Sequence, residues 1–69
     1  MLVEDIEKRF TYHKPKDGQP GKYTEIRNTA KNLALLIDDL CPDSREKSIA
    51  MTKLEEAVMW ANAAIARNE

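Results

Sequence analysis

Three of the four aromatic residues in this 69-residue chain lie within residues 9–27, together with its only histidine and both of its glycines. The same stretch carries five cations, namely Arg9, Lys14, Lys16, Lys22 and Arg27. Aromatic rings stack on nucleobases, and a guanidinium can hold a phosphate with two donors. We therefore interpret this stretch as a binding surface for an anion with flat rings, with Tyr12 and Arg27 as the leading contacts. Four further candidates for the same ligand are Phe10, His13, Lys14 and Lys31.

The sequence contains no arrangement that is typical of an enzyme. Cys41 precedes a proline and lies far along the chain from His13, whereas an activated thiol needs a histidine partner. The carboxylate pairs at 38–39 and 55–56 occupy adjacent helix positions, which point about 100° apart, so neither pair shares a proton. One cysteine and one histidine cannot supply the ligands of a zinc site. We therefore expect a binding protein without cofactor or metal, in which Cys41 is a small buried capping residue.

The charge of the chain is concentrated in one zone rather than large overall. The formal net charge is −1, yet residues 8–31 hold seven basic residues and two acidic ones. A nearly neutral chain is not expected to coat a DNA or RNA polymer, because proteins that do so are strongly basic. A local basic zone favours a compact anionic ligand. A solvated charged surface is the alternative interpretation of the same residues.

Helices must position these residues, because apolar residues recur with helical spacing through most of the chain. The sequence predicts one all-α domain over 1–69, with a short helix in 1–10, a basic loop over 11–20 and long helices over 21–40 and 43–68. Pro15, Gly18 and Pro20 mark the loop. The first long helix carries an apolar seam with alternating spacings of three and four, formed by Tyr23, Ile26, Ala30, Leu33, Ile37 and Leu40.

The second long helix carries a matching seam, formed by Met51, Leu54, Val58, Ala61 and Ile65. Asp43 and Glu46 have the spacing of a capping box, which places the start of this helix near Asp43. Pro42 ends the preceding helix, because the residue before a proline is pushed out of the helical region. A very short connection then joins the two helices, so they must form an antiparallel αα-hairpin.

A second apolar stripe on the last helix has no partner within one hairpin. It consists of Ala50, Ala57, Trp60 and Ala64. A chain this short buries only about 60% of its unfolded surface, and its single cysteine excludes an intrachain disulfide. We therefore expect a homo-oligomer, although alanine also favours helix without any partner. The alternative function is that of a helical oligomeric adaptor or regulator, which binds a protein through the Trp60 stripe.

The sequence predicts neither a membrane span nor export from the cytoplasm. No apolar run approaches the roughly 18–20 residues that cross a bilayer. The chain shows no signal peptide, and its single cysteine fits a reducing cytoplasm. We therefore expect no membrane partner.

Two segments resemble the small phage anti-CBASS proteins that act as cyclic-oligonucleotide sponges. They are RFTYHKPKDGQPGKY and CPDSREKSIAMTKLEEAVMWANAAIARN, and the resemblance extends from about Ile6 to Asn68. It implies a homohexamer that holds cyclic dinucleotides such as cyclic GMP–AMP between protomers and cyclic trinucleotides at a separate, three-fold-related site. It also implies that the ligands are not cleaved. Their sequestration in the bacterial host cytoplasm during infection would then block activation of the CBASS effector.

The resemblance also implies roles for individual residues. Tyr12 would stack on a base of a cyclic dinucleotide, and Arg27 would pair with a phosphate at a position where some family members have lysine. Arginine preserves the charge of that contact but changes its geometry. Thr29 and Arg67 match positions of the trinucleotide pocket, so we expect the two ligand classes to occupy different sites.

Overall fold

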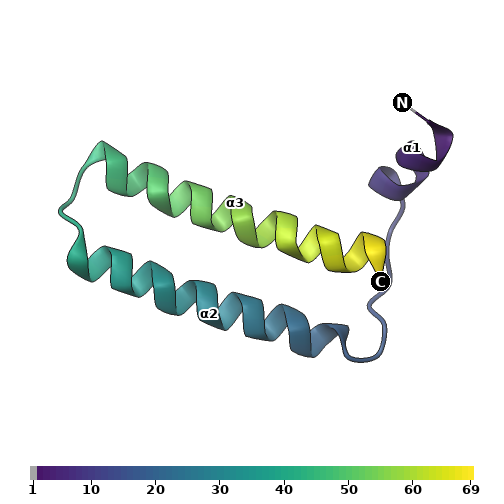
Figure 1. The fold of residues 1–69 in the computed structure, drawn as a ribbon, viewed down its shortest axis with the longest axis horizontal. Helices are drawn as coiled ribbons and strands as arrows, with labels where there is room; N and C mark the ends of the chain where they lie inside the picture. Colours follow the sequence, from purple (N-terminus) through teal and green to yellow (C-terminus); the bar gives the residue numbers. More distant parts are fainter. Residues whose placement is uncertain (1) are drawn as a thin grey trace.

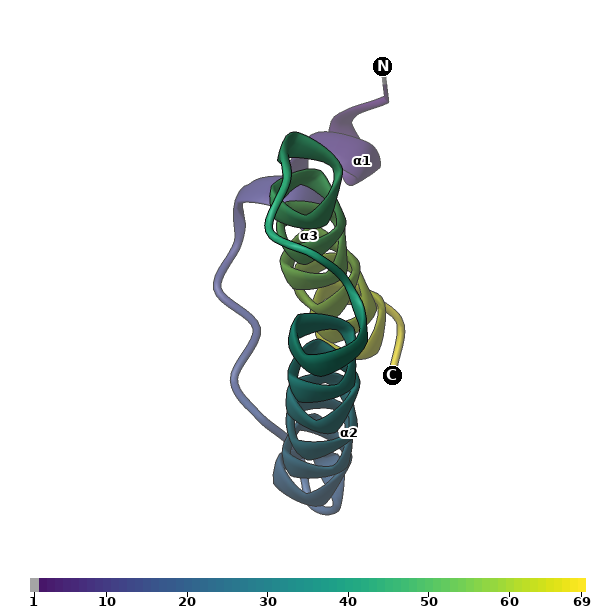
Figure 2. The ribbon, with the colours of Figure 1, turned by 90° about the vertical axis from the view of Figure 1, so that its left-hand side faces the viewer.

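The computed structural model of this protein describes residues 2–69 as three helices, α1 (Val3–Phe10), α2 (Gln19–Leu40) and α3 (Arg45–Asn68). α2 and α3 lie side by side and antiparallel, while α1 lies beyond the open end of this hairpin, near the end of the chain (Figure 1). The molecule measures 45 × 30 × 12 Å and is therefore a flat slab (Figure 2). No strand occurs in the described residues. The predicted all-α fold, with a short first helix and a long αα-hairpin, is confirmed.

The basic loop is shorter than predicted, because α2 begins at Gln19 and not near Gly21. Gly18 is the N-cap and has φ of 85°, a left-handed conformation that favours glycine. Pro20 then lies in the first turn of α2, where its missing N–H costs no helical hydrogen bond. The sequence interpretation treated this proline as a loop residue, which explains the difference of two residues.

α2 ends at Leu40, as the Cys41-Pro42 step predicts. The N–H of Cys41 donates to the carbonyl of Ile37 at 2.9 Å and caps the last turn. The side chain of Cys41 is nevertheless exposed, so the expectation of a buried capping residue is wrong. The backbone of Cys41 is extended, with φ of −103° and ψ of 136°, so the helix has ended before this residue.

α3 begins at Arg45, two residues after the predicted start at position 43. The N-cap is Ser44, whose Oγ accepts a hydrogen bond from the backbone N–H of Lys47 at 3.1 Å. The carboxylate of Asp43 instead accepts from Nζ of Lys47 at 3.0 Å, and so does that of Asp38. Because these two carboxylates, Asp38 first, stabilise the ammonium group, they raise the pKa of Lys47 above its ordinary value. Lys47 thereby joins the end of α2 to the first turn of α3.

The seam between α2 and α3 is half-buried and follows the predicted residues except at two positions. Leu33 and Leu40 remain 46% and 70% exposed, and Ala34 lies in the seam in place of Leu33. A period of 3.5 residues from Ala30 falls between positions 33 and 34, so the spacing alone does not decide between them. The smaller side chain is the more covered of the two, and the leucine lines a groove beside Leu54 at one edge of the seam.

One copy of the chain has little interior. Within residues 2–69, no apolar side chain is fully buried, and Gln19, which is 3% exposed, is the one buried residue. Large apolar side chains face outward instead, among them Phe10, Leu35, Leu36, Leu40, Met59 and Trp60. Extensive exposed apolar surface is typical of a surface that binds a partner. The homo-oligomer stays a prediction, and the 63% exposure of Trp60 is the observation that supports it.

None of the three helices within residues 2–69 combines the length and the apolar character needed to cross a membrane.

Candidate functional site

A cleft lies at the open end of the hairpin, where the loop after α1 and the first turns of α2 face the last turns of α3. Its volume is about 580 Å³, within the range of roughly 300–1,000 Å³ that is usual for small-molecule sites. The cleft is lined by Thr11, Tyr12, His13, Tyr23, Arg27, Asn62, Ala63, Ala66 and Arg67. The loop therefore supplies its polar and aromatic rim, and α3 supplies two alanines as an apolar wall.

Local spacing explains why these side chains meet. Tyr23 and Arg27 are four residues apart on α2, and Ala63 and Arg67 are four residues apart on α3, so each pair shares one helix face. The start of α2 and the end of α3 lie at the same end of an antiparallel hairpin (Figure 1). The two faces therefore form opposite walls of one cleft, and the loop closes its third side.

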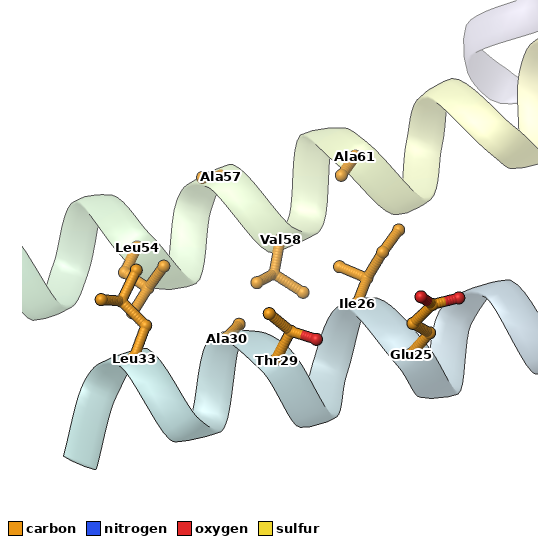
Figure 3. Close-up of a pocket in the computed structure, with 9 residues that line it drawn as sticks. All are labelled: Glu25, Ile26, Thr29, Ala30, Leu33, Leu54, Ala57, Val58 and Ala61. Carbon is orange, nitrogen blue, oxygen red and sulfur yellow. The ribbon is translucent and has the colours of Figure 1, made fainter. Parts of the chain in front are cut away.

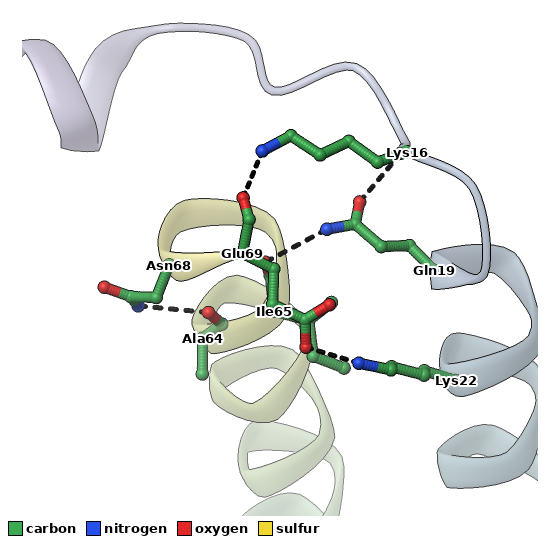
Figure 4. Close-up of polar contacts among 7 residues, drawn as sticks. All are labelled: Lys16, Gln19, Lys22, Ala64, Ile65, Asn68 and Glu69. Carbon is green, nitrogen blue, oxygen red and sulfur yellow. Dashed lines mark hydrogen bonds and ion pairs between the residues drawn. The ribbon is translucent and has the colours of Figure 1, made fainter.

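Hydrogen bonds to Gln19 hold the loop against α3. The Oε1 of Gln19 accepts from the backbone N–H of Lys16 at 2.9 Å, and its Nε2 donates to the carbonyl of Ile65 at 3.4 Å (Figure 4). Because Gln19 is 3% exposed, these bonds are largely shielded from competing water. Farther along the loop, Nε2 of His13 donates to the carbonyl of Lys8 at 2.8 Å. Gln19 thus joins the loop to the hairpin, and His13 joins it to the end of α1.

Two lysines of the basic stretch contact the end of the chain instead of lining the cleft. Nζ of Lys22 lies 2.7 Å from Oε2 of Glu69, and Nζ of Lys16 donates to the main-chain oxygen of the same residue (Figure 4). The hydrogen bond from Lys22 is the main reason that the pKa of the Glu69 carboxyl is lowered. These two cations therefore stabilise the open end of the hairpin.

The two arginines of the cleft differ from those lysines in their partners. Nη2 of Arg27 contacts only the hydroxyl of Thr24, at 3.5 Å, and the residue is exposed. Arg67 is half-buried. Within residues 2–69, neither guanidinium lies within ion-pair distance of a carboxylate. The cleft therefore combines two cations that an anion can approach with the 82% exposed ring of Tyr12.

The structure brings together four of the residues predicted from the sequence, namely Tyr12, His13, Arg27 and Arg67. Lys14 lines an adjacent depression of about 470 Å³, which also borders Tyr12, His13 and Arg67. Lys31 lies farther along the same side of the hairpin, in a groove of about 390 Å³ that begins at Arg27. Phe10 ends α1, is 81% exposed and does not line the cleft.

Thr29 lies apart from all of these residues. It lines a largely apolar groove of about 430 Å³ on the opposite side of the seam, beside Ile26 and Leu33 (Figure 3). Thr29 and Arg67 therefore share no cavity within one chain. A trinucleotide pocket made from both would have to combine the Thr29 of one copy with the Arg67 of another.

Sequence reasoning placed Tyr23 in the seam and within the aromatic, basic stretch, without naming it as a ligand contact, and it did not identify Asn62. Tyr23 lies half-buried at the seam and borders the cleft with its remaining surface. Asn62 occupies the helix position just before Ala63, one turn before Ala66. Tyr23 could have been found from its place four residues before Arg27 on the same face of α2, whereas no pattern in the sequence marks Asn62.

Comparison with known proteins places the chain in a family. Residues 2–66 match the family described as Acb2/Tad1, hairpin domain. A search of curated proteins found no match. A search of solved structures also found none. The family match covers α1, α2 and all but the last two residues of α3, and it includes every lining residue of the cleft except Arg67.

Proposed function

Because the chain belongs to the Acb2/Tad1 hairpin-domain family, the anti-CBASS sponge family, we propose that it sequesters cyclic di- and trinucleotide second messengers. The bound messengers are released intact. The messenger no longer reaches the CBASS effector, so the effector is not activated. The protein performs this function in the cytoplasm of the bacterial host during phage infection.

The cleft at the open end of the hairpin is the observation that carries this proposal. Tyr12 presents an exposed ring, and stacking on such a ring contributes about 1–3 kcal/mol per base. Arg27 and Arg67 line the same cleft without a carboxylate partner in residues 2–69. One guanidinium group can donate two parallel hydrogen bonds to the oxygens of a phosphate. A stacking ring beside two available cations suits a nucleotide with flat bases and a charged backbone.

The exposed apolar surface supports assembly of several copies, which we propose form a homohexamer. A pair of copies related by a two-fold axis would present two Arg27 side chains to the two phosphates of a cyclic dinucleotide. Three copies related by a three-fold axis would present three Arg67 and three Thr29 side chains to a cyclic trinucleotide. This second arrangement is consistent with the placement of Thr29 and Arg67 in different cavities of one chain.

A second candidate function is binding of a protein partner. Trp60 and Met59 are each 63% exposed on α3, and aromatic and methionine side chains are enriched where proteins bind one another. In the proposed assembly, other copies of the same chain cover this surface. The two functions differ in whether a nucleotide binds without any protein partner.

Calorimetry of the purified protein against a panel of linear and cyclic nucleotides, in metal-free buffer, tests the proposal. We expect saturable binding of cyclic di- and trinucleotides and much weaker binding of the linear forms. Mass spectrometry of the recovered ligand should show it unchanged. Sedimentation of the same sample should show six copies per particle. A stable monomer, cleaved ligand or absence of cyclic-nucleotide binding would each contradict the corresponding part of the proposal.

A further inference from the structure

Asn62 contains a polar atom that the chain does not satisfy. Its Oδ1 is buried and accepts no hydrogen bond from any residue within 2–69. Folded proteins rarely leave a buried side-chain acceptor in this state, because the lost contact with water is not replaced. Such an atom therefore calls for a physical explanation.

The surroundings of Asn62 indicate where a partner for this amide would come from. The residue lines the cleft together with Tyr12, Arg27 and Arg67. Its neighbours on the wall formed by α3 include Ala63 and Ala66, whose methyl groups offer no hydrogen bond. A ligand that occupied the cleft would therefore lie next to an amide whose bonding capacity the protein leaves unused.

Stacking contacts and contacts to phosphates cannot distinguish one base from another. Stacking on Tyr12 accepts any base, because every base has an aromatic face. Arginine contacts to phosphates fix the position of a nucleotide but carry no information about its bases. The Nε2 of His13 already donates to the carbonyl of Lys8. A carboxamide, by contrast, offers one directional acceptor and two directional donors.

We propose that Asn62 is a specificity-determining residue, which accepts a hydrogen bond from a donor of the bound nucleotide. The donor is an N–H group of a base or a hydroxyl group of a ribose. Because Oδ1 is covered in the single chain, this contact requires a half-turn about the Cβ–Cγ bond, which exchanges the oxygen and nitrogen of the amide and leaves the nitrogen in the covered position. This inference rests on the proposed function, because it requires a nucleotide in this cleft.

Asn62→Leu tests the inference, since leucine has a similar shape and no polar atom. We expect the affinity for cyclic GMP–AMP to fall about tenfold or more. The melting temperature of the ligand-free protein should stay constant or rise by a few degrees, because the substitution removes an unsatisfied acceptor. An asparagine with a merely structural role would give the opposite change in melting temperature. Asn62→Ala, which cannot clash, provides a second variant.

The matched control is Asn32→Leu, the same substitution at an exposed amide of α2 that lines none of the cavities described above. It should leave the affinity for cyclic GMP–AMP within about twofold. A comparable loss of affinity in this control would attribute the effect of Asn62→Leu to leucine itself and would overturn the inference.

Ligand analogues identify the donor that Asn62 contacts. The pair to compare is a 2′-deoxy form of cyclic GMP–AMP and a form with inosine in place of guanosine, which lacks the exocyclic amino group. If an analogue lacks the donor, the native protein should bind it more weakly than it binds cyclic GMP–AMP. Asn62→Leu should bind that analogue and cyclic GMP–AMP with equal affinity. Such non-additivity is the signature of a direct contact. A third analogue lacks the amino group of adenine. If each of the three analogues lost as much affinity for Asn62→Leu as for the native protein, the inference would be overturned.

Three further outcomes separate this inference from the proposed function. Unchanged binding by Asn62→Leu overturns the inference and leaves the proposed function intact. Loss of assembly in Asn62→Leu and Asn62→Ala, measured by sedimentation, would mean that Asn62 pairs with a neighbouring copy and not with ligand. Absence of cyclic-nucleotide binding by the native protein would contradict the proposed function, and the inference would fall with it.

Discussion

The two ends of the hairpin use their cations differently. At the closed end, the ammonium group of Lys47 lies 3.0 Å from carboxylate oxygens of both Asp38 and Asp43. At the open end, Arg27 and Arg67 border a cleft in which, within residues 2–69, no carboxylate approaches them. A cation therefore contributes to the structure where the chain supplies a carboxylate, and it stays accessible to an anionic ligand where the chain does not.

The open end is itself divided between support and recognition. Lys22 contacts Glu69, and Gln19 bridges Lys16 to the carbonyl of Ile65, so this group of residues holds the loop in place. The residues that we propose contact the ligand line the neighbouring cleft. A change in the supporting group should therefore alter stability first, and a change in the cleft should alter binding first.

The largest expected effect is that of Arg27→Ala on cyclic dinucleotide binding. If the phosphate is desolvated between protomers of the proposed assembly, we expect a loss of about 2–5 kcal/mol, because the substitution leaves that phosphate without its partner. The melting temperature should hardly change, since Arg27 forms no ion pair within residues 2–69. Calorimetry and thermal unfolding of the same sample measure both quantities.

Lys47→Met is the control for that experiment at the closed end. It should lower the melting temperature and leave the dissociation constant for cyclic GMP–AMP unchanged, because Lys47 lies at the far end of the hairpin. If both substitutions weakened binding equally, the distinction between the two ends would be wrong.

Arg67→Ala tests whether the two ligand classes use different sites. Arg67 lines the same cleft as Arg27 in one chain, yet the family resemblance implies a role for Arg67 in binding cyclic trinucleotides. We expect Arg67→Ala to weaken trinucleotide binding by at least about tenfold and to change dinucleotide binding little. Saturating dinucleotide should not displace a bound trinucleotide in a titration. Direct competition would instead reduce the arrangement to one shared cleft.

Tyr12→Ala should cost about 1–3 kcal/mol of cyclic dinucleotide binding through lost stacking. The ring is 82% exposed, so its removal should leave the melting temperature nearly unchanged. Tyr12→Phe is the matched control, because it keeps the ring and removes only the hydroxyl. Retained affinity in Tyr12→Phe and reduced affinity in Tyr12→Ala, both measured by calorimetry, would assign the effect to stacking.

The sequence predicted the arrangement of the helices well, because apolar periodicity and a proline determine where a hairpin forms and turns. The predicted seam of α3 and most of that of α2 are half-buried as expected. The helix starts were displaced by two residues, since proline is tolerated in a first turn and two adjacent residues, Asp43 and Ser44, could both cap α3. Only the geometry shows that Lys47 engages the aspartate and leaves the serine as the cap.

The candidate site was predicted in part. Tyr12 and Arg27 followed from residue chemistry and spacing, whereas the placement of Arg67 beside them depends on which face of α3 the seam leaves free. Thr29 lies on the other side of the seam, which likewise depends on how the two helices pack and could not be predicted from spacing. Asn62 could not be identified, because an unsatisfied acceptor is a property of packing and leaves no pattern in the sequence.

The smallest expected effects are those of pH on the two ends. The pKa of Lys47 is raised above its ordinary value of 10.5 by Asp38 and then Asp43. The stabilisation it provides is therefore complete below pH 10.5 and is lost as the pH rises through the raised value. The pKa of Glu69 is lowered below its ordinary value of 4.5, chiefly by Lys22. Its stabilisation is present above pH 4.5 and is lost as the pH falls through the lowered value.

Thermal unfolding of the native protein, Lys47→Met and Glu69→Gln across pH 3–11 would test this opposition between the two ends. We expect the difference in melting temperature between the native protein and Lys47→Met to be constant near neutral pH and to shrink above pH 10.5. The difference in melting temperature between the native protein and Glu69→Gln should shrink below pH 4.5, and it should be small because both partners of this ion pair remain substantially exposed. If the Glu69→Gln difference instead persisted at acidic pH, the carboxylate would not be the group through which Glu69 holds the open end.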